Sequence, residues 1–365
     1  MRLTMLLLIA LMAQTGPDKL TDYDGDWARM KPNTPRGYVC HRTDEPITID
    51  GRAEEGAWRK APWTEYFRDI EGDLKPDPLF KTRAKLLWDD EYLYVYAELE
   101  EPHVWATLTK KNSRIFDDND FEVFIDPDGD NHHYYEFEMN ALNTIWELML
   151  MKPYKDGGPV VNPRNLEGTK TAVHVRGTIN DPSDFDEGWS VEIAIPLKGL
   201  KEYAQGVACP PKDGDYWRLG FSRVEWQVMI EDGRYKKIPG TKEYNWIWSP
   251  QGIIDMHRPE RWGFIQFTAR PPGEEVPFVM DPTLAARDLL MGVYHRQRAY
   301  RQKFGQWAKS LDALGMEGDT PESVVGPVRI EVHNGGYTAS ATIRMPDGGT
   351  RKIHTRQDSK IWFGG

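Results

Sequence analysis

Short stretches of alternating apolar and polar residues, separated by clusters of glycine, proline and aspartate, constrain this chain more than any other feature. They recur at close intervals between residues 38 and 267. Such spacing is typical of an antiparallel β-sandwich or jelly roll. Helical periodicity is scarce there, which argues against a βαβ dinucleotide-binding fold or an α/β barrel. We therefore expect a mainly β domain over residues 36–270, with strands at residues 85–88, 92–99, 121–126, 134–140, 144–150, 173–179, 189–195, 217–226 and 262–267.

The alternation also predicts which face of a strand each side chain occupies. In residues 120–126, the apolar residues at odd positions are expected in the core, and the acidic residues at positions 120 and 122 on the opposite face. Two other predicted strands carry polar pairs on one face. We expect neighbouring strands to gather these side chains into one polar patch, formed by Glu122, Glu138, Asn140, Arg223 and Glu225.

The pattern changes to that of a helix over residues 282–315. Apolar residues recur there with a 3.6-residue period, Asp281 and Pro282 supply an N-cap and a first-turn proline, and Gly315 is expected to end the helix. We expect the apolar stripe to dock on the sandwich. The opposite face is basic, which predicts a solvated surface or, as the less common alternative, contact with an anionic partner of the cell envelope.

Residues 328–363 alternate again and contain two hairpin signals. These are Asn334-Gly335-Gly336 and Asp347-Gly348-Gly349, each between two alternating runs. A small antiparallel meander is expected, and because such a unit is marginally stable alone, it should pack on the helix or extend a sheet edge.

The first residues predict export. Arg2 gives a basic start, residues 3–12 form an apolar run, and Ala13 is a small residue suited to cleavage. The run is too short to span a bilayer. We therefore expect a signal peptide over residues 1–14 and a periplasmic or extracellular location.

Two cysteines, Cys40 and Cys209, are present in the chain. In an oxidising compartment they can form a disulfide, which would stabilise the fold by roughly 5 kcal/mol on the chain-entropy model. We expect this bridge. Two separately buried thiols are the alternative.

An acidic turn follows the predicted strand that ends at Asp126. Asp126, Asp128 and Asp130 alternate around Gly129, a spacing that lets hard oxygen ligands converge on one Ca²⁺. The glutamate that an EF-hand needs at loop position 12 is absent. A structural calcium ion is therefore expected here, and a solvated acidic turn is the alternative.

Charge and aromatic content narrow the classes of partner. The chain has 46 Lys+Arg against 57 Asp+Glu, a net charge of -11, which disfavours nucleic acid as a partner. It also contains 14 tryptophans. Most are expected in the sandwich core, and a few are candidates for flat platforms on which sugar rings stack.

Five motifs, in this order, resemble the family-9 carbohydrate-binding modules. They lie at residues 47–58 (ITIDGRAEEGAW), 87–95 (LWDDEYLYV), 119–126 (NDFEVFID), 189–196 (WSVEIAIP) and 261–264 (RWGF). The resemblance implies a β-sandwich, structural calcium and sugar binding, often beside glycoside hydrolases in polysaccharide breakdown. It does not extend to the predicted helix or the C-terminal meander.

The resemblance also implies site residues. Glu122 matches a sugar-contacting carboxylate, and Asn140 matches an amide that hydrogen-bonds sugar hydroxyls. Glu138 stands where an arginine is expected. The candidate carbohydrate-binding residues are Phe116, Glu122, Glu138, Asn140, Arg223, Met256 and His257.

The two stacking positions depart most from the family pattern. Phe116 and Met256 stand where the family places two indoles, which predicts weak binding. Trp246 and Trp248 offer a substitute platform if a loop turns one of them outward.

Three functions follow from these features. The leading hypothesis is an exported, non-catalytic protein that binds a neutral saccharide and is associated with polysaccharide catabolism. The first alternative is a glycoside hydrolase that uses Glu122 and Glu138 as its carboxylate pair. The second is a structural or interaction module of the cell envelope whose helix and meander dock to a partner.

Overall fold

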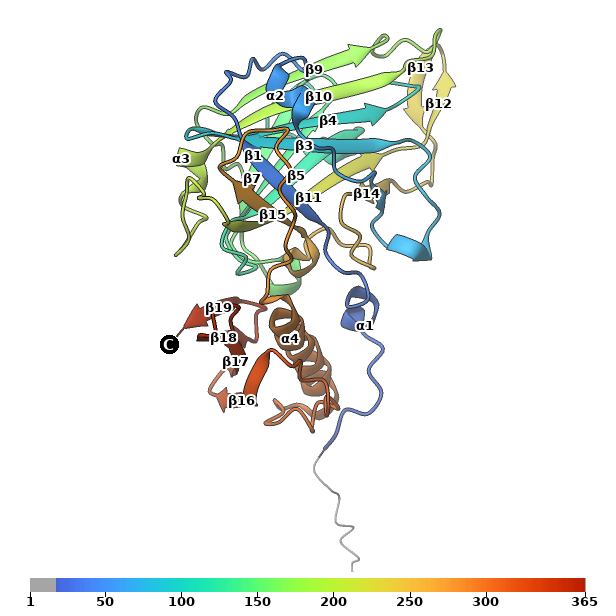
Figure 1. Ribbon diagram of the computed structural model, residues 1–365. Coiled ribbons are helices and arrows are strands. Elements are labelled where there is room, and N and C mark those ends of the chain that lie inside the picture. The colour runs from blue at the N-terminus through green and yellow to red at the C-terminus, as the bar shows by residue number, and fades with distance from the viewer. Residues whose placement is uncertain (1–17, 365) are drawn as a thin grey trace, which may run out of the picture.

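The computed structural model describes residues 18–364, and the predicted signal peptide lies outside the described residues. A sheet of 13 strands curls around a common core and forms the upper body in Figure 1. Its main path runs β8-β7-β6-β5-β11-β15-β1-β3-β4-β10-β9, and β14 joins β11 to β2. Strand β1 pairs in parallel with β15 and β3, and the other pairs are antiparallel.

The elements of this body alternate short strands with brief helical turns. The strands of the large sheet are β1 Gly37–Arg42, β2 Arg68–Asp69, β3 Thr82–Trp88, β4 Tyr92–Glu100, β5 Asp120–Asp126, β6 Tyr134–Asn140, β7 Ile145–Leu150, β8 Val160–Val161, β9 Lys170–Arg176, β10 Gly188–Pro196, β11 Tyr216–Glu225, β14 Tyr244–Ile247 and β15 Gly263–Thr268. A separate hairpin consists of β12 Val228–Glu231 and β13 Arg234–Lys237. The short helices are α1 Asp26–Met30, α2 Gly56–Lys60, α3 Leu197–Leu200, η1 Gly72–Leu74, η2 Ile115–Asp117, η3 Tyr154–Asp156 and η4 Pro259–Arg261.

The core lies between the two layers that the curled sheet forms. Phe121, Val123 and Ile125 are fully buried in it, as their odd positions in β5 predict. Side chains from β3, β4 and β10 pack against them in one apolar cluster. The predicted mainly β, antiparallel sandwich is confirmed.

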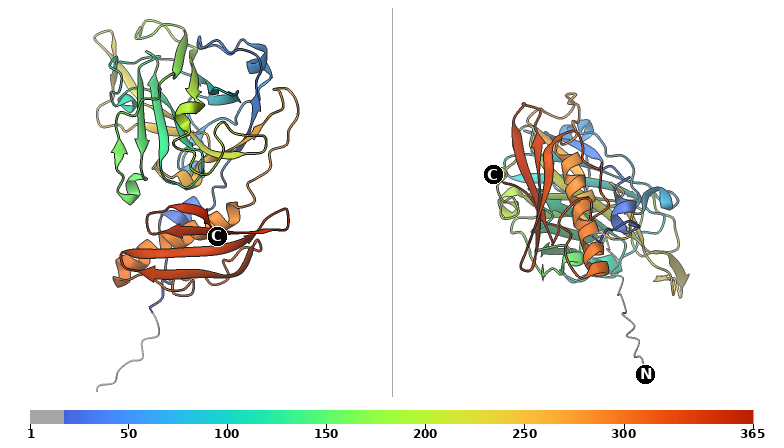
Figure 2. Two further views of the ribbon diagram at one scale, coloured as in Figure 1. Left: turned by 90° about the vertical axis from the view of Figure 1, so that its left-hand side faces the viewer. Right: turned by 90° about the horizontal axis from the view of Figure 1, so that it is seen from below.

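A long helix and a second sheet form the lower body. Helix α4, Leu284–Phe304, packs along a four-stranded meander in the order β16-β17-β18-β19 (Figure 2). The strands are β16 Val324–His333, β17 Gly336–Arg344, β18 Thr350–Arg356 and β19 Ile361–Gly364. The predicted meander is therefore present. Within residues 18–364, no helix is long and apolar enough to cross a bilayer.

The apolar stripe of α4 does not dock on the sandwich as expected. Leu290, Val293 and Tyr294 share a separate apolar cluster with Tyr337 of β17 and Ile353 of β18, and the N-terminal segment completes that cluster. The stripe therefore builds a second core with the meander. The sequence pattern identifies an apolar face but not the element that covers it.

Helix α4 also ends earlier than expected. Its last residue is Phe304, and Gly305 follows with φ 72°, a left-handed conformation that suits glycine. Three of its arginines hold other parts of the chain and are not simply solvated. Arg287 donates to the Gly129 carbonyl at 2.7 Å, Arg296 to the Leu314 carbonyl at 2.9 Å, and Arg298 to Asp156 at 3.1 Å.

The expected bridge between Cys40 and Cys209 is not formed. Both cysteines are free thiols. Cys40 is buried in the sandwich core, and the Cys209 thiol donates to the Leu197 carbonyl at 3.2 Å. The structure thus has the alternative arrangement of two separate thiols.

A close contact of Gly263 gives a test of the packing. A Cβ atom added to Gly263 of β15 would lie 2.3 Å from the ring of Trp248, which is fully buried. We expect Gly263→Ala to lower the free energy of unfolding by about 1 to 3 kcal/mol, because the indole has no space to move into. The exposed Gly349→Ala serves as the control in thermal melts. Equal melting temperatures for both variants would contradict this packing.

Candidate functional site

The outer face of strands β5 and β6 brings the predicted polar residues together. In the register of this pair, Glu122 lies opposite Glu138 and Asp120 lies opposite Asn140. Glu136, two residues before Glu138, shares the same face because strand side chains alternate. Oxygen atoms of Asp120, Glu122 and Glu138 lie within 4.8 Å of one another. We call Asp120, Glu122, Glu136 and Glu138 the strand cluster.

The strand cluster is buried, and no basic side chain of the described residues neutralises its negative charge. Its four residues are at most 5% exposed, and none of their carboxyl groups forms an ion pair with the lysines, arginines or histidines of residues 18–364. Burial raises the pKa of Glu122 to about 7. Burial, together with the charge of Glu122, raises the pKa values of the other three well above their usual range.

Arg223 does not join this face, contrary to the sequence-based prediction. Ser222, not Arg223, lies opposite Glu122 in the register of β11 and β5, so Arg223 points to the other side of the sheet. There its guanidinium pairs with Glu101 at 2.9 Å and Glu225 at 2.8 Å. Alternation correctly placed Arg223 with Glu225, but the register between strands was not readable from one sequence.

Asn140 lies beside the strand cluster, and its amide is already in use. Its Nδ2 donates to Asp118 at 3.0 Å and to the Leu108 carbonyl at 2.9 Å. Its Oδ1 accepts the backbone N–H groups of Leu142 and Thr144. Asn140 therefore shapes the turn between β6 and β7 and has no free donor for a sugar hydroxyl.

Half-buried side chains border the strand cluster. Phe116 in η2 donates its backbone N–H to Glu138 at 3.1 Å, and its ring lies 6.2 Å from that of Trp146. Trp146 lies opposite Glu138 in β7. We call Phe116 and Trp146 the ring pair. The sequence motifs pointed to Phe116 but missed Trp146. Its even position in β7 places it on the same sheet face as Glu138 of β6, and this alternation could have identified it.

Met256 and His257 lie on the same face, next to β11 and β6. The Met256 methyl group approaches Gly220, where a Cβ atom would be 2.6 Å away. The His257 ring accepts or donates a hydrogen bond of 2.8 Å with the Tyr134 hydroxyl and packs edge-on against Tyr154. Desolvation lowers the pKa of His257 to about 4, so the ring is neutral at pH 7.

The substitute platform does not form. Trp246 is 2% exposed and Trp248 is fully buried, and both belong to the sandwich core.

The acidic turn after β5 is held by internal donors. Asp126, Asp128 and Asp130 offer oxygens within 4.8 Å of one another. Each carboxylate accepts at least one backbone N–H group of the turn, and Lys360 pairs with Asp130 at 2.8 Å. Burial and the neighbouring charges raise the pKa of Asp128 to about 7. Lys360 therefore supplies one positive charge to this turn.

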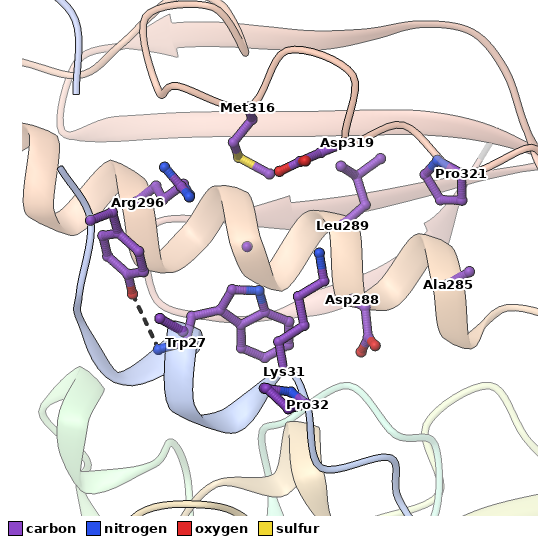
Figure 3. Close-up of a pocket in the computed structure, with 13 residues that line it drawn as sticks. Trp27, Lys31, Pro32, Ala285, Asp288, Leu289, Arg296, Met316, Asp319 and Pro321 are labelled. Carbon is purple, nitrogen blue, oxygen red and sulfur yellow. Dashed lines mark hydrogen bonds between the residues drawn. The ribbon is translucent and has the colours of Figure 1, made fainter. Parts of the chain in front are cut away.

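A cavity of about 330 Å³ lies away from both clusters, between α1 and α4 (Figure 3). Trp27 forms one wall, but its ring already stacks on His295 and carries the Arg261 guanidinium at 4.7 Å. Because Trp27 is also only 4% exposed, its ring does not serve as an open platform for a sugar.

Comparison with known proteins identifies the region that carries the strand cluster. Residues 49–210 match the family model described as carbohydrate family 9 binding domain-like, which confirms the resemblance drawn from the motifs. Endo-1,4-beta-xylanase C of Paenibacillus barcinonensis is 30% identical over 154 residues, or 42% of this chain. Endo-1,4-beta-xylanase A of Thermotoga maritima is 33% identical over 158 residues, also 42%. The chain spans only 12% of the length of each relative.

Solved structures of similar proteins include two with full coverage of their own chains. A family 9 carbohydrate binding module from Caldicellulosiruptor kristjanssonii, in complex with cellotriose, aligns with 67% of this chain at 16% identity and a TM-score of 0.42. A putative carbohydrate-binding protein from Bacteroides uniformis aligns with 64% at 17% identity and a TM-score of 0.47.

The electrostatics of Glu122 predict an unusual dependence of stability on pH. Its pKa is raised to about 7 in the folded state, so the folded protein binds more protons than the unfolded chain between about pH 4.5 and 7. The contribution of Glu122 to the free energy of unfolding is therefore most favourable below pH 4.5 and is lost as the pH rises through 7. We expect Glu122→Gln to raise the free energy of unfolding by about 1 to 3 kcal/mol at pH 8 in a chelator, and to change it little at pH 5.

Glu192 provides a matched control for this prediction. Its pKa is also raised to about 7 by burial, but its carboxylate accepts N–H groups from Trp58, Asp50 and Gly51. Glu192→Gln should therefore destabilise the fold, because an amide oxygen cannot replace a carboxylate that holds three donors. Denaturant titrations at both pH values measure the effect. Destabilisation by Glu122→Gln at pH 8 would contradict the assignment.

Proposed function

We propose that this chain, which carries a carbohydrate family 9 binding domain-like region over residues 49–210, is an exported, non-catalytic carbohydrate-binding protein associated with polysaccharide breakdown. The family match supports saccharide binding. The basic and apolar start of the sequence supports export. The xylanases among its relatives support a connection with polysaccharide breakdown.

The observation that carries this proposal is the ring pair beside the strand cluster. Phe116 and Trp146 are half-buried and close together, so part of each ring faces solvent. Stacking of the C–H face of a sugar on such rings supplies affinity, and nearby polar groups supply orientation. We assign the saccharide to this surface and take a neutral oligosaccharide as its ligand.

The geometry of Glu122 and Glu138 supports a binding role over a hydrolytic one. A glycosidase holds its two carboxyl groups at about 5 to 5.5 Å or 6.5 to 9.5 Å, on the two sides of the scissile bond. Glu122 and Glu138 lie side by side on adjacent strands of one sheet face and are 5% and 1% exposed, so they do not face each other across an open cleft.

The second alternative, an interaction module of the envelope, receives less support. Its strongest sequence feature was the apolar stripe of the predicted helix. In α4 this stripe is buried against β17 and β18, so it is not available to a partner.

The structural calcium implied by the resemblance stays a prediction. At the acidic turn, the donor set has the right chemistry, but Lys360 already supplies a positive charge to Asp130. A calcium ion at that place has to compete with this ammonium group.

Saccharide binding at the ring pair is tested by removing one ring at a time. We expect a dissociation constant of about 0.1 to 1 mM for the best oligosaccharide, because Phe116 has less area than an indole. Trp146→Ala and Phe116→Ala should each weaken binding about tenfold. Calorimetry with cellotriose and xylo-oligosaccharides measures the effect.

Phe185→Ala is the control, because Phe185 is 81% exposed and packs against His103, away from the ring pair. It should leave the affinity unchanged. Wild-type affinity in Trp146→Ala and Phe116→Ala would place the saccharide elsewhere.

A further inference from the structure

We propose that Asp120, Glu122 and Glu138 bind a hard divalent cation of the Ca²⁺ class at the base of the ring pair. This site differs from the acidic turn at residues 126–130. The inference does not depend on the proposed saccharide binding, because it rests on the donor atoms of the strand cluster alone.

The spacing of the oxygens fits one metal ion. Oxygens of Asp120, Glu122 and Glu138 lie within 4.8 Å of one another. Calcium binds oxygen at about 2.3 to 2.6 Å, so two ligands on opposite sides of an ion are about 4.6 to 5.2 Å apart. One oxygen from each of these three carboxylates can therefore reach the same ion.

A polar atom without a partner supplies a further indication. Asp120 is completely buried, and although its Oδ1 accepts the Val224 N–H at 3.1 Å, its Oδ2 has no hydrogen-bond partner in the described chain. Buried polar groups are almost always paired. A cation gives the carboxylate oxygen its missing partner.

The charge balance indicates the same ligand. Elsewhere in residues 18–364, three buried glutamates have basic partners: Arg223 pairs with Glu101 and Glu225, and Lys155 with Glu260. Buried Glu192 has no basic partner but accepts three N–H groups. The four carboxyl groups of the strand cluster have no such basic neighbour. Concentrated buried negative charge is costly unless it is neutralised by protons or by a bound cation.

A small ion suits this position better than an organic amine. The four residues of the strand cluster are at most 5% exposed, and oxygens of Asp120, Glu122 and Glu138 are close enough to share a single ion. An amino sugar would need space for its ring between Glu122 and Glu138. Binding of glucosamine without any metal binding is therefore an outcome that contradicts the proposal.

The test uses the full chain, freed of metal with a chelator and titrated with Ca²⁺ alone by calorimetry and thermal melting. Glu122→Gln/Glu138→Gln should bind one ion fewer than wild type, or bind it about tenfold or more weakly. Calcium should raise the melting temperature of wild type by several degrees more than that of this variant. The matched control is Asp128→Asn/Asp130→Asn, which removes two carboxylates from the acidic turn and should keep the ion that the first variant loses.

Three results would overturn the proposal. The first is an unchanged number of ions with unchanged affinity in Glu122→Gln/Glu138→Gln. The second is loss of all binding in Asp128→Asn/Asp130→Asn while the strand variant binds normally. The third is absence of binding in wild type at millimolar Ca²⁺ and Mn²⁺. Circular dichroism of each variant without metal shows that it is folded, and since no saccharide is added, failure of saccharide binding does not affect the result.

Discussion

The pairing register of β5 with its two neighbours determines the chemistry of this protein. It places Glu138 on one side of Glu122 and Ser222 on the other. A shift by one residue would exchange the two faces, bury charges in the sandwich and bring Arg223 onto the acidic face. The apolar residues Phe121, Val123 and Ile125 prevent this shift, because they fill the core on the opposite side of the same strand. The core thus fixes the position of the carboxylates.

The fold was largely predictable because alternation and turn residues are local signals. They correctly gave the sandwich, the buried residues of β5 and the C-terminal meander. They did not give the register between distant strands, so Arg223 was assigned to the wrong face. They also did not give the partner of the apolar stripe in α4, which packs on β17 and β18. Both depend on contacts between residues far apart in the sequence.

The candidate site was predicted in part. Glu122, Glu138, Phe116, Met256 and His257 lie on one face, as the motifs suggested. Asn140 was placed on the correct face, but its four hydrogen bonds could not be predicted from the sequence. They depend on the conformation of a turn and on the position of Asp118. Trp146, Asp120 and Glu136 became visible as members of the site only through the pairing of β5, β6 and β7.

The contacts of the acidic turn bear on where this protein can be divided. Arg287 of α4 holds the Gly129 carbonyl, and Lys360, just before β19, holds Asp130. Both cations come from the part of the chain beyond the family-matched region. A fragment cut after β15 would keep every strand of the sandwich but expose three adjacent aspartates without either cation. The sandwich therefore depends on residues beyond the family-matched region for the positive charge near its acidic turn. The lower body, formed by α4 and the meander, supplies that charge.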